Sequence, residues 1–600
     1  MHYWKALVFL RSRLTLNQRE PLSLDELTQA LGCTRRNAQL IIKKLVLEGW
    51  IEWQAGLGRG NFPKVKLIKP VHDFLQQQAN FLIRENKLDQ ALLLIEEKKR
   101  DAFLADYIGH YQDKRSQNTK NQQDILQIPF YRGTHNLDPI YISRRTESHI
   151  SSYLYSNLLR FDPLKNTFEG DLATDWKRDG NTWIFTLRKG LKFHDASPLK
   201  ALDVKAHFDR VRTANHQNSQ LFDCIKKVEV LDPLRLVFYM QSLSGHLPTL
   251  LTNTPAGITK KVMGAEKTSI IGSGSFVLNE QNDWLTRLTA FKQYHAFRPW
   301  MDAIEIWNIG DKAKDFKLHC DLVHPHQLIS IEANQRPEFE QKVQWEKGCE
   351  YVLINANKSR FLGFEENRCL LQSLLKALGV PQDILEDKGE LVSFATGMLS
   401  IPQAPPYSLP KMQKETVKKI AKKLLEKVVL PYYVKGEINP DVSRLQILTY
   451  PLPQHIAIAK YYCEQLNKLG LACEYKVEEF PVFSLNETAD KADIIISGEV
   501  FCESIMDMNW LGWLKACSSL EACLSREQRS WRDDTLETIS NEPDENKRAD
   551  LFNQMEALLI ERGSYLPLFH VQQQLNQADS LNPMELLANG WIDFNRVTFK

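Results

Sequence analysis

Residues 23–49, SLDELTQALGCTRRNAQLIIKKLVLEG, predict two short helices joined by a tight turn. Ser23 and Glu26 have the spacing of a capping box, in which the serine hydroxyl accepts from the Glu26 amide and the Glu26 carboxylate reaches back to the serine amide. Gly32 stops the first helix after about 8 residues, because glycine enters the left-handed conformation without a steric cost. The turn that follows is therefore short.

The second helix begins after Thr34, whose hydroxyl can cap it, and runs to Glu48 before Gly49. Its inward face carries apolar residues at helical spacing, namely Ala38, Ile41, Ile42 and Leu45. Its outward face is polar and basic, so it can donate to phosphates and to base edges. The predicted DNA contacts of this helix are Thr34, Arg35, Arg36, Asn37, Gln39 and Lys43. The two helices have the spacing of a helix-turn-helix.

A β-hairpin is predicted next. Residues 50–53 (WIEW) and 64–68 (KVKLI) read as strands, and residues 56–61 (GLGRGN) read as a glycine-rich turn between them. Arg59 lies between two glycines at the tip, and Lys64 begins the returning strand. Both are predicted to contact a groove or a phosphate, so the hairpin is a basic wing.

Positive charge is concentrated in the same seventy residues. The whole chain has a formal net charge of +2, whereas residues 1–70 hold 12 Lys and Arg against 5 Asp and Glu, a net charge of +7. The other 530 residues therefore sum to −5. Basic faces are usually only solvated, and capped helix pairs occur in proteins that never contact DNA. Together with a packing helix over residues 4–14, however, this order of elements is typical of a winged helix-turn-helix that binds double-stranded DNA.

Length and composition narrow the remaining classes. A chain of 600 residues is too long for one hydrophobic core, and 43% hydrophobic with 25% charged residues is ordinary for a folded, soluble chain. The ten cysteines form no CxxC pair and no cluster with histidine at zinc spacing, which favours reduced thiols, no metal and no cofactor. Residues 1–16 do not read as a secretory signal and no apolar run reaches roughly 18 residues, so a cytoplasmic protein without a membrane span is expected.

The sequence predicts three parts. They are a winged helix-turn-helix domain over residues 1–70, a helical connector with a polar linker over residues 71–125, and an α/β region over residues 126–600. The linker is the polar run over residues 113–124. The connector helices either pack on the DNA-binding domain or dimerise, and the oligomeric state stays open.

Several segments after residue 126 resemble one protein family. Residues 131–139 (YRGTHNLDP), 151–159 (SSYLYSNLL) and 181–195 (NTWIFTLRKGLKFHD) are similar to the opening segments of oligopeptide and dipeptide solute-binding proteins, called family 5. Residues 590–594 (GWIDF) fit the closing segment of that family. The resemblance implies an α/β, two-lobed domain of the periplasmic-binding-protein-like type II class, which closes on a small-molecule ligand between its lobes.

A winged helix in front of such a domain resembles the SgrR-type transcriptional regulators. The TRR of residues 34–36, the GW of residues 49–50 and the GRG of residues 58–60 match that family's pattern. The resemblance implies a ligand-responsive regulator of the sugar-phosphate stress response, which binds a promoter region and senses a small cytoplasmic solute, with a sugar phosphate as one candidate. The expected fold class is multidomain, with an all-α or winged helix domain followed by the two-lobed α/β domain.

The ligand contacts are harder to predict. In the transporter members of family 5, an acid in a segment shaped W..D..P...L holds the α-amine of a peptide. Residues 497–508 (SGEVFCESIMDM) lack that tryptophan and that proline, which disfavours a free-amine peptide. A phosphorylated or neutral ligand needs Arg, His and Asn donors instead. The predicted ligand contacts, each with the alternative of a merely polar surface residue, are Arg132, His135, Asn136 and Arg144.

Two other functions fit parts of the sequence. A solute-binding component of an ABC transporter is the alternative to a regulator, but the basic domain and the missing signal disfavour it. A hydrolase needs a nucleophile and a base. Residues 272–275 (GSGS) lack the GK[ST] of a phosphate loop, and the S-x-x-K of residues 373–376 has no partner motifs. No catalytic residue and no enzyme activity are therefore expected.

Overall fold

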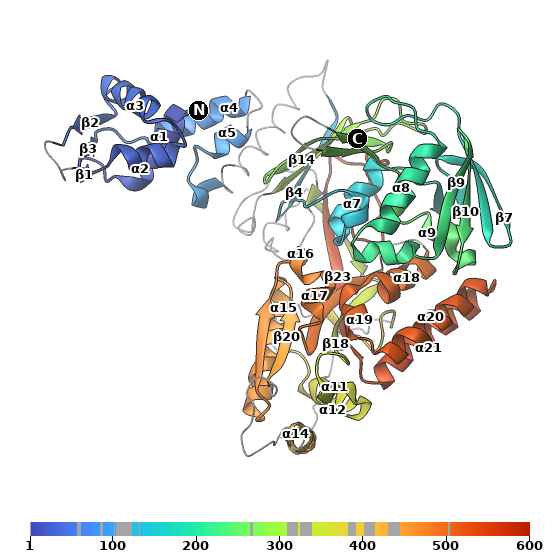
Figure 1. The fold of residues 1–600 in the computed structure, drawn as a ribbon. Helices are drawn as coiled ribbons and strands as arrows, with labels where there is room; N and C mark the ends of the chain where they lie inside the picture. Colours follow the sequence, from blue (N-terminus) through green and yellow to red (C-terminus); the bar gives the residue numbers. More distant parts are fainter. Residues whose placement is uncertain are drawn as a thin grey trace.

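The computed structural model contains a small N-terminal part, blue in Figure 1, beside a much larger C-terminal part. It describes residues 2–56, 62–84, 88–100, 103, 123–130, 132–263, 268–308, 322–323, 339–381, 384, 392–400, 414–429, 444–501 and 505–600. The multidomain architecture predicted from the sequence is confirmed, with helices dominating the small part and sheets with covering helices the large one.

Three helices build the N-terminal domain, namely α1 (His2–Arg13), α2 (Leu24–Leu31) and α3 (Arg35–Leu47). The Ser23 hydroxyl caps α2 by accepting from the Glu26 amide at 3.0 Å, and Gly32 ends the helix with a φ of 61°. The second half of the predicted capping box is wrong, because the Glu26 carboxylate accepts from Arg13 Nε at 2.9 Å instead. A partner from α1 thus replaces the backbone amide that the local motif would use.

A three-stranded antiparallel sheet completes this domain. Its strands, in the order β1-β3-β2, are β1 (Arg19–Pro21), β3 (Lys64–Leu67) and β2 (Ile51–Gln54). The two strands of the predicted wing are confirmed, whereas its turn, with Arg59, lies outside the described residues. The sequence did not predict β1, since three residues that end in proline are too few to show a strand pattern.

Two further helices, α4 (His72–Arg84) and α5 (Leu88–Leu92), follow the wing. Leu75 and Ala79 of α4 and Ala91 of α5 are fully buried in one hydrophobic core with α1, α2 and α3. The connector helices therefore pack on the helix-turn-helix, the first of the two arrangements that the sequence left open. The domain boundaries at residues 70 and 125 stay predictions.

The first lobe of the C-terminal part lies in the upper half of Figure 1. One sheet has the order β13-β14-β15-β4, in which β15 and β4 run parallel, and a second has the order β7-β8-β10-β9. The strands of this lobe are β4 (Ile125–Phe130), β5 (Leu159–Asp162), β6 (Thr167–Gly170), β7 (Ala173–Asp179), β8 (Thr182–Leu187), β9 (Ile225–Asp232), β10 (Arg235–Met240), β11 (Lys260–Met263), β12 (Thr268–Ile271), β13 (Phe276–Gln281), β14 (Leu285–Ala290) and β15 (Ala303–Asn308). Its α-helices are α7 (Arg145–Leu154), α8 (Ala201–Thr213) and α9 (Leu247–Leu250).

The second lobe is built on a sheet of eight strands in the lower half of Figure 1. These strands are β16 (Leu322–Val323), β17 (Phe339–Trp345), β18 (Gly348–Ile354), β19 (Val392–Phe394), β20 (Leu445–Thr449), β21 (Cys473–Val477), β22 (Ile494–Val500) and β23 (Tyr565–Ala578). The helices around it are α11 (Arg360–Gly363), α12 (Glu365–Leu378), α14 (Lys414–Val429), α15 (Pro453–Lys468), α16 (Phe480–Phe483), α17 (Asn486–Ala489), α18 (Met506–Ala516), α19 (Ser518–Cys523), α20 (Arg526–Asn541) and α21 (Glu545–Glu561).

Strand β23 connects the two lobes. Phe569 belongs to the hydrophobic core of the second lobe, whereas Leu575, six residues further along, lies in the core under β4, β13 and β15. The chain end then returns to the first lobe, where Trp591 and Phe594 are buried in the same core. The two-lobed α/β prediction for this part of the chain is confirmed.

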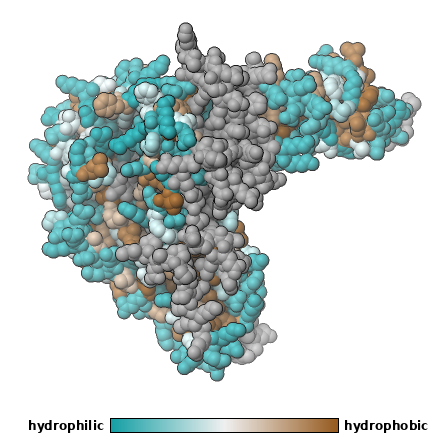
Figure 2. Space-filling model, turned by 180° about the vertical axis from the view of Figure 1, so that it is seen from behind, coloured by the Kyte–Doolittle hydropathy of each residue, from teal (hydrophilic) through white to brown (hydrophobic). Residues whose placement is uncertain are grey.

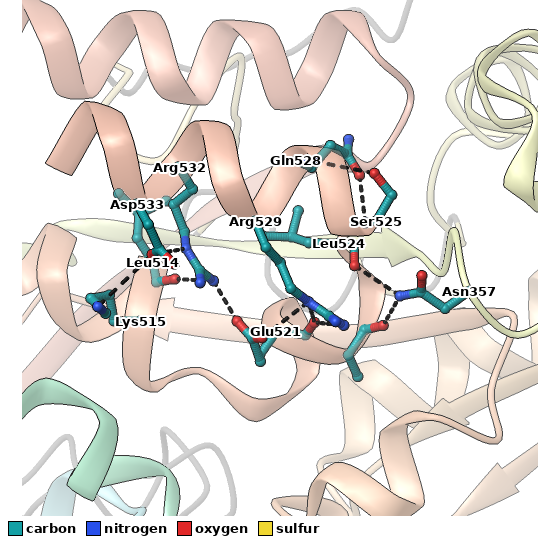
Figure 3. Close-up of polar contacts among 11 residues, drawn as sticks. Asn357, Leu514, Lys515, Glu521, Leu524, Ser525, Gln528, Arg529, Arg532 and Asp533 are labelled. Carbon is teal, nitrogen blue, oxygen red and sulfur yellow. Dashed lines mark hydrogen bonds and ion pairs between the residues drawn. The ribbon is translucent and has the colours of Figure 1, made fainter. Parts of the chain in front are cut away.

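A polar network holds the helices at the lower right of Figure 1 together and is enlarged in Figure 3. Arg532 of α20 is buried and donates to the Leu514 carbonyl at 3.1 Å and to the Glu521 carboxylate. Arg529, one turn earlier, donates to the Glu521 carbonyl at 2.7 Å. These bonds fasten α20 to α18 and α19, which form part of the cavity wall described below.

Candidate DNA-binding face and ligand cavity

The outward face of α3 carries the predicted DNA contacts. The exposed side chains are those of Thr34, Arg35, Arg36, Gln39 and Lys43, and that of Asn37 is half-buried. The Thr34 hydroxyl also caps the helix by accepting from the Asn37 amide at 3.4 Å. In this cap the hydroxyl only accepts, so its own O–H can still donate, and the exposed donors of the face are Thr34, the two arginines, Gln39 and Lys43.

An exposed ion pair holds one of these arginines. Arg35 Nε lies 3.6 Å from Asp25 Oδ1, and the two side chains are 67% and 76% exposed. Pairs of this kind contribute little in water, so the guanidinium can exchange Asp25 for a phosphate. Lys64 is exposed at the start of β3. A hydrophobic strip is visible on this otherwise hydrophilic domain in Figure 2, and exposed apolar residues here include Leu40 and Leu47.

A cavity of about 910 Å³ lies between the two lobes. The loop after β4 and the start of α7 line it from the first lobe, and β18, β22, α16 and α18 line it from the second. Its volume lies at the upper end of the range of about 300–1,000 Å³ that is typical of small-molecule sites. The predicted position of a ligand between lobes is therefore matched by space in the structure.

Arg132, a predicted ligand contact, lines the cavity but is already bonded. Its guanidinium donates to both oxygens of Glu147, at 2.6 and 3.1 Å, and the Glu147 side chain is only 2% exposed. Although burial opposes ionisation, the hydrogen bonds from Arg132 hold the pKa of Glu147 below its usual range. The charge of Arg132 is thus largely neutralised inside the wall.

His135 and Arg144 line the cavity as predicted, whereas Asn136 does not. Arg144 Nη1 lies 2.7 Å from His135 Nε2, and its guanidinium lies 4.9 Å from the centre of the Phe480 ring of the second lobe. Burial and the charge of Arg144 lower the pKa of His135, so the neutral ring can accept from Arg144. Asn136 is exposed, and its Oδ1 accepts from the Asp138 amide at 2.9 Å, which makes it a turn residue.

Arg145, which the sequence did not single out, bridges the lobes. Its Nη1 donates at 2.6 Å to Glu346, which lies between β17 and β18 and also accepts from Gln573 of β23. Together with the contact of Arg144 on Phe480, this ion pair joins α7 of the first lobe to the second lobe beside the cavity.

Two carboxylates of neighbouring strands differ in their surroundings. Glu350 of β18 is bonded by His455 and by Gln454 Nε2, the latter at 3.3 Å. Glu499 of β22 lies on the other face of the sheet, toward Tyr351 and Cys517. Burial raises the pKa of Glu499 to about 7, with the Val500 amide and Arg145 opposing that rise. Within the described residues, no side chain hydrogen-bonds the carboxylates of Glu499, Asp283 or Glu479, and Glu499 is the least exposed of these three cavity residues.

Replacing Glu499 by glutamine is expected to flatten the pH dependence of stability. The folded state raises the pKa of Glu499 from 4.5 to about 7, so its proton stabilises the fold at low pH and this stabilisation is lost as the pH rises through 7. The shift corresponds to about 3 kcal/mol at most. Melting temperatures measured from pH 5 to 8 should fall less steeply for Glu499→Gln than for the unaltered chain. Parallel curves would show that Glu499 ionises normally in the fold. The titratable groups around Glu499 are the same in both proteins, namely Arg145, Tyr351, Cys349 and Cys517.

The described part of the chain also contains residue types that bind metals or form disulfides. It holds no group of three or more His, Cys, Asp or Glu side chains placed to bind a metal ion. The eight cysteines that lie in it are unbridged, and burial raises the pKa of several, among them Cys349 and Cys523. None of its helices combines the length and the apolar character that a membrane crossing requires.

Family models match both parts of the chain. Residues 7–118 match the model described as "Sugar transport-related sRNA regulator N-term", and residues 167–319 match "Bacterial extracellular solute-binding proteins, family 5 Middle". The resemblances stated from the sequence are confirmed by these two matches. They cover the helix-turn-helix with its connector and a large part of the first lobe.

Known proteins resemble the chain either in sequence or in fold. A protein of Salmonella choleraesuis called "HTH-type transcriptional regulator SgrR" is 26% identical over 343 residues, which are 56% of this chain and 58% of that protein. The alignment thus spans little more than half the length of that relative. Two solved structures share the fold of the C-terminal part: a dipeptide-binding protein of a Pseudoalteromonas species (17% identity, TM-score 0.61, 79% of this chain, 100% of that one) and the oligopeptide-binding protein AppA of Bacillus subtilis (16%, 0.63, 80%, 100%).

Proposed function

We propose that this chain, which joins an SgrR-type N-terminal domain to a family 5 solute-binding fold, is a ligand-responsive transcriptional regulator. It binds double-stranded promoter DNA through α3 and the wing, and it works in the cytoplasm without a catalytic step. The observation that carries the proposal is the presence, in one chain, of an exposed basic helix face and a cavity between two lobes. A transport receptor does not need a basic helix face that binds DNA. A DNA-binding protein that responds to no ligand does not need a cavity between two lobes.

A regulator of this kind needs a physical connection between cavity and DNA-binding domain. The turn between β13 and β14 supplies a candidate. Asp283 lines the cavity, whereas the next two residues, Trp284 and Leu285, pack with the core of the N-terminal domain. Arg100, from the segment after α5, lies with its guanidinium 5.6 Å from the centre of the Trp284 ring. Movement of this turn on ligand binding would therefore change its contacts with the core that contains the connector helices.

The end of β15 supports the same connection. Asn308 lines the cavity and donates from its side chain to the Asp283 carbonyl at 2.8 Å, while its amide donates to the Trp284 carbonyl at 2.8 Å. Trp307, the residue before it, is 3% exposed and lies in the core of the N-terminal domain. The β13–β14 turn and the end of β15 thus each place one residue in the cavity wall and a neighbouring residue in the core of the DNA-binding domain.

The solute in this proposal is a small molecule of sugar metabolism. A sugar phosphate is the finer prediction from the sequence, and Arg132, Arg144 and Arg145 are the cavity residues that a phosphate would approach. A response to sugar-phosphate stress does not require the phosphate ester itself to enter the cavity, since a related sugar can report the same metabolic state.

Footprinting on the DNA upstream of the chain's own coding region tests the proposal, because such regulators often control their own promoter. A protected site of one or two helical turns is the expected result. In parallel, a thermal-shift panel of sugars, sugar phosphates and short peptides tests the sensor, since a ligand of the folded state must raise the melting temperature. Ligand binding without any protected DNA would contradict a regulator and favour a solute receptor.

A further inference from the structure

The cavity carries more negative than positive charge. Its three arginines face five carboxylates, those of Asp283, Glu346, Glu350, Glu479 and Glu499. With histidines neutral, the described lining therefore has a formal charge of −2 when Glu499 is ionised and −1 when it is protonated, and both states are populated near its pKa of about 7. A second negative group brought by a ligand is repelled in such a space, and more strongly than in water because the surroundings are poorly polarisable.

Two of the arginines are not available at low cost. Arg132 holds both oxygens of Glu147, which is buried with 2% of its side chain exposed. Arg145 holds Glu346 at 2.6 Å and so joins the two lobes. A phosphate that took either guanidinium would leave a buried carboxylate unpaired, and such a charge strongly destabilises the fold. The guanidinium groups of Arg132 and Arg145 thus hold carboxylates of the protein before they can bind an anion.

The wall offers acceptors instead. The Glu499 carboxylate lines the cavity and has no side-chain hydrogen bond within the described residues. Tyr450 and Phe480 are aromatic residues of the wall that are partly exposed. Buried acceptors are normally satisfied, so a ligand that fits this wall must bring donors.

We propose that the cavity selects a sugar that offers hydroxyl or ammonium donors and carries no phosphate, with Glu499 as the acceptor that recognises it. Aromatic rings of the wall cover the apolar faces of the sugar ring, and the carboxylate takes its donors. This inference rests on the proposed function only in treating the cavity as the sensor site. It names the ligand chemistry and leaves the DNA-binding role as a separate question.

Calorimetric titration of the full chain with two matched pairs of probes tests the inference. The pairs are glucose with glucose 6-phosphate, and glucosamine with glucosamine 6-phosphate. We expect each parent sugar to bind about tenfold more tightly than its phosphate ester, since an uncompensated charge in a partly buried site costs at least that much. Tighter binding of glucosamine than of glucose would identify an ammonium as the preferred donor, and the reverse order a hydroxyl.

The variant Glu499→Gln separates recognition from general charge. It should weaken the better-bound parent sugar about tenfold and narrow the difference between parent and ester, because it removes one negative charge and one strong acceptor. Glu464→Gln, which changes an exposed acid of α15 outside the cavity, is the matched control and should alter neither. Tighter binding of a phosphate ester, no binding of any of the four probes, or unchanged affinities in Glu499→Gln would overturn the inference. Because no DNA is present, these outcomes are independent of the footprint.

Discussion

The double variant Arg35→Ala/Arg36→Ala is expected to lose most of its affinity for DNA. Both side chains are exposed in the first turn of α3, where a helix-turn-helix contacts the groove and the phosphates. Losing two charged contacts should weaken binding about 30-fold or more, which corresponds to about 2 kcal/mol. The salt dependence should flatten as well, since each phosphate contact contributes about 0.9 to its slope. Fluorescence anisotropy titrations from about 50 to 200 mM salt measure both quantities.

Lys418→Ala/Lys419→Ala is the matched control for that experiment. These neighbouring lysines are exposed on α14, far along the chain in the second lobe, and removing them changes the net charge by the same amount. Affinity and salt slope should stay those of the unaltered chain. An equal loss in both double variants would mean that DNA responds to net charge alone, and an unaffected Arg35→Ala/Arg36→Ala would place the DNA contacts elsewhere.

Local signals explain why the helix-turn-helix was predictable. The Ser23 and Thr34 caps and the turn at Gly32 depend on residues within four positions of one another, so they can be read from the sequence and are found in the structure. The exception is the Glu26 carboxylate, which bonds Arg13. Arg13, which is distant in the sequence, replaced the local Ser23 amide as the partner of Glu26. A rule based on residue spacing cannot predict such a replacement. Strand β1 was not predicted for a related reason. It is a strand because it pairs with β3, and its three residues alone carry no strand pattern.

The cavity shows the limits of sequence reasoning more clearly. Arg132, His135 and Arg144 were found because they stand in one short segment of a recognisable family pattern, and all three line the cavity. Their donors are nevertheless engaged by Glu147 and by each other. Glu346, the partner of Arg145, and Glu499, the proposed acceptor, lie far from that segment in the sequence and were not identified. Their role depends on burial and on which charges the fold brings beside them, and neither property is encoded in local spacing.

Replacing Trp307 by alanine is expected to uncouple the two parts of the chain. Its ring is 3% exposed and packs, with Leu285, in the core of the N-terminal domain, although both residues belong to the first lobe. Truncating a buried aromatic side chain costs about 3–5 kcal/mol, through lost contacts and a residual cavity. Differential scanning calorimetry should therefore show the N-terminal domain melting in a separate transition at lower temperature, while the unaltered chain melts with the two parts linked.

The matched control for this change is Trp300→Ala, which removes an equally large ring that is 59% exposed near the start of β15. It should leave the transition unchanged. If Trp307→Ala lowered the melting temperature without separating a second transition, the tryptophan would stabilise the first lobe alone. Below the melting temperature of the N-terminal domain, Trp307→Ala should still bind DNA, because the exposed side chains of α3 that contact DNA are not part of the altered core. Any effect of a bound solute on the DNA affinity should be reduced in Trp307→Ala. The segment that carries Trp307 ends at Asn308 in the cavity wall, so it connects the ligand cavity to the domain that contains α3.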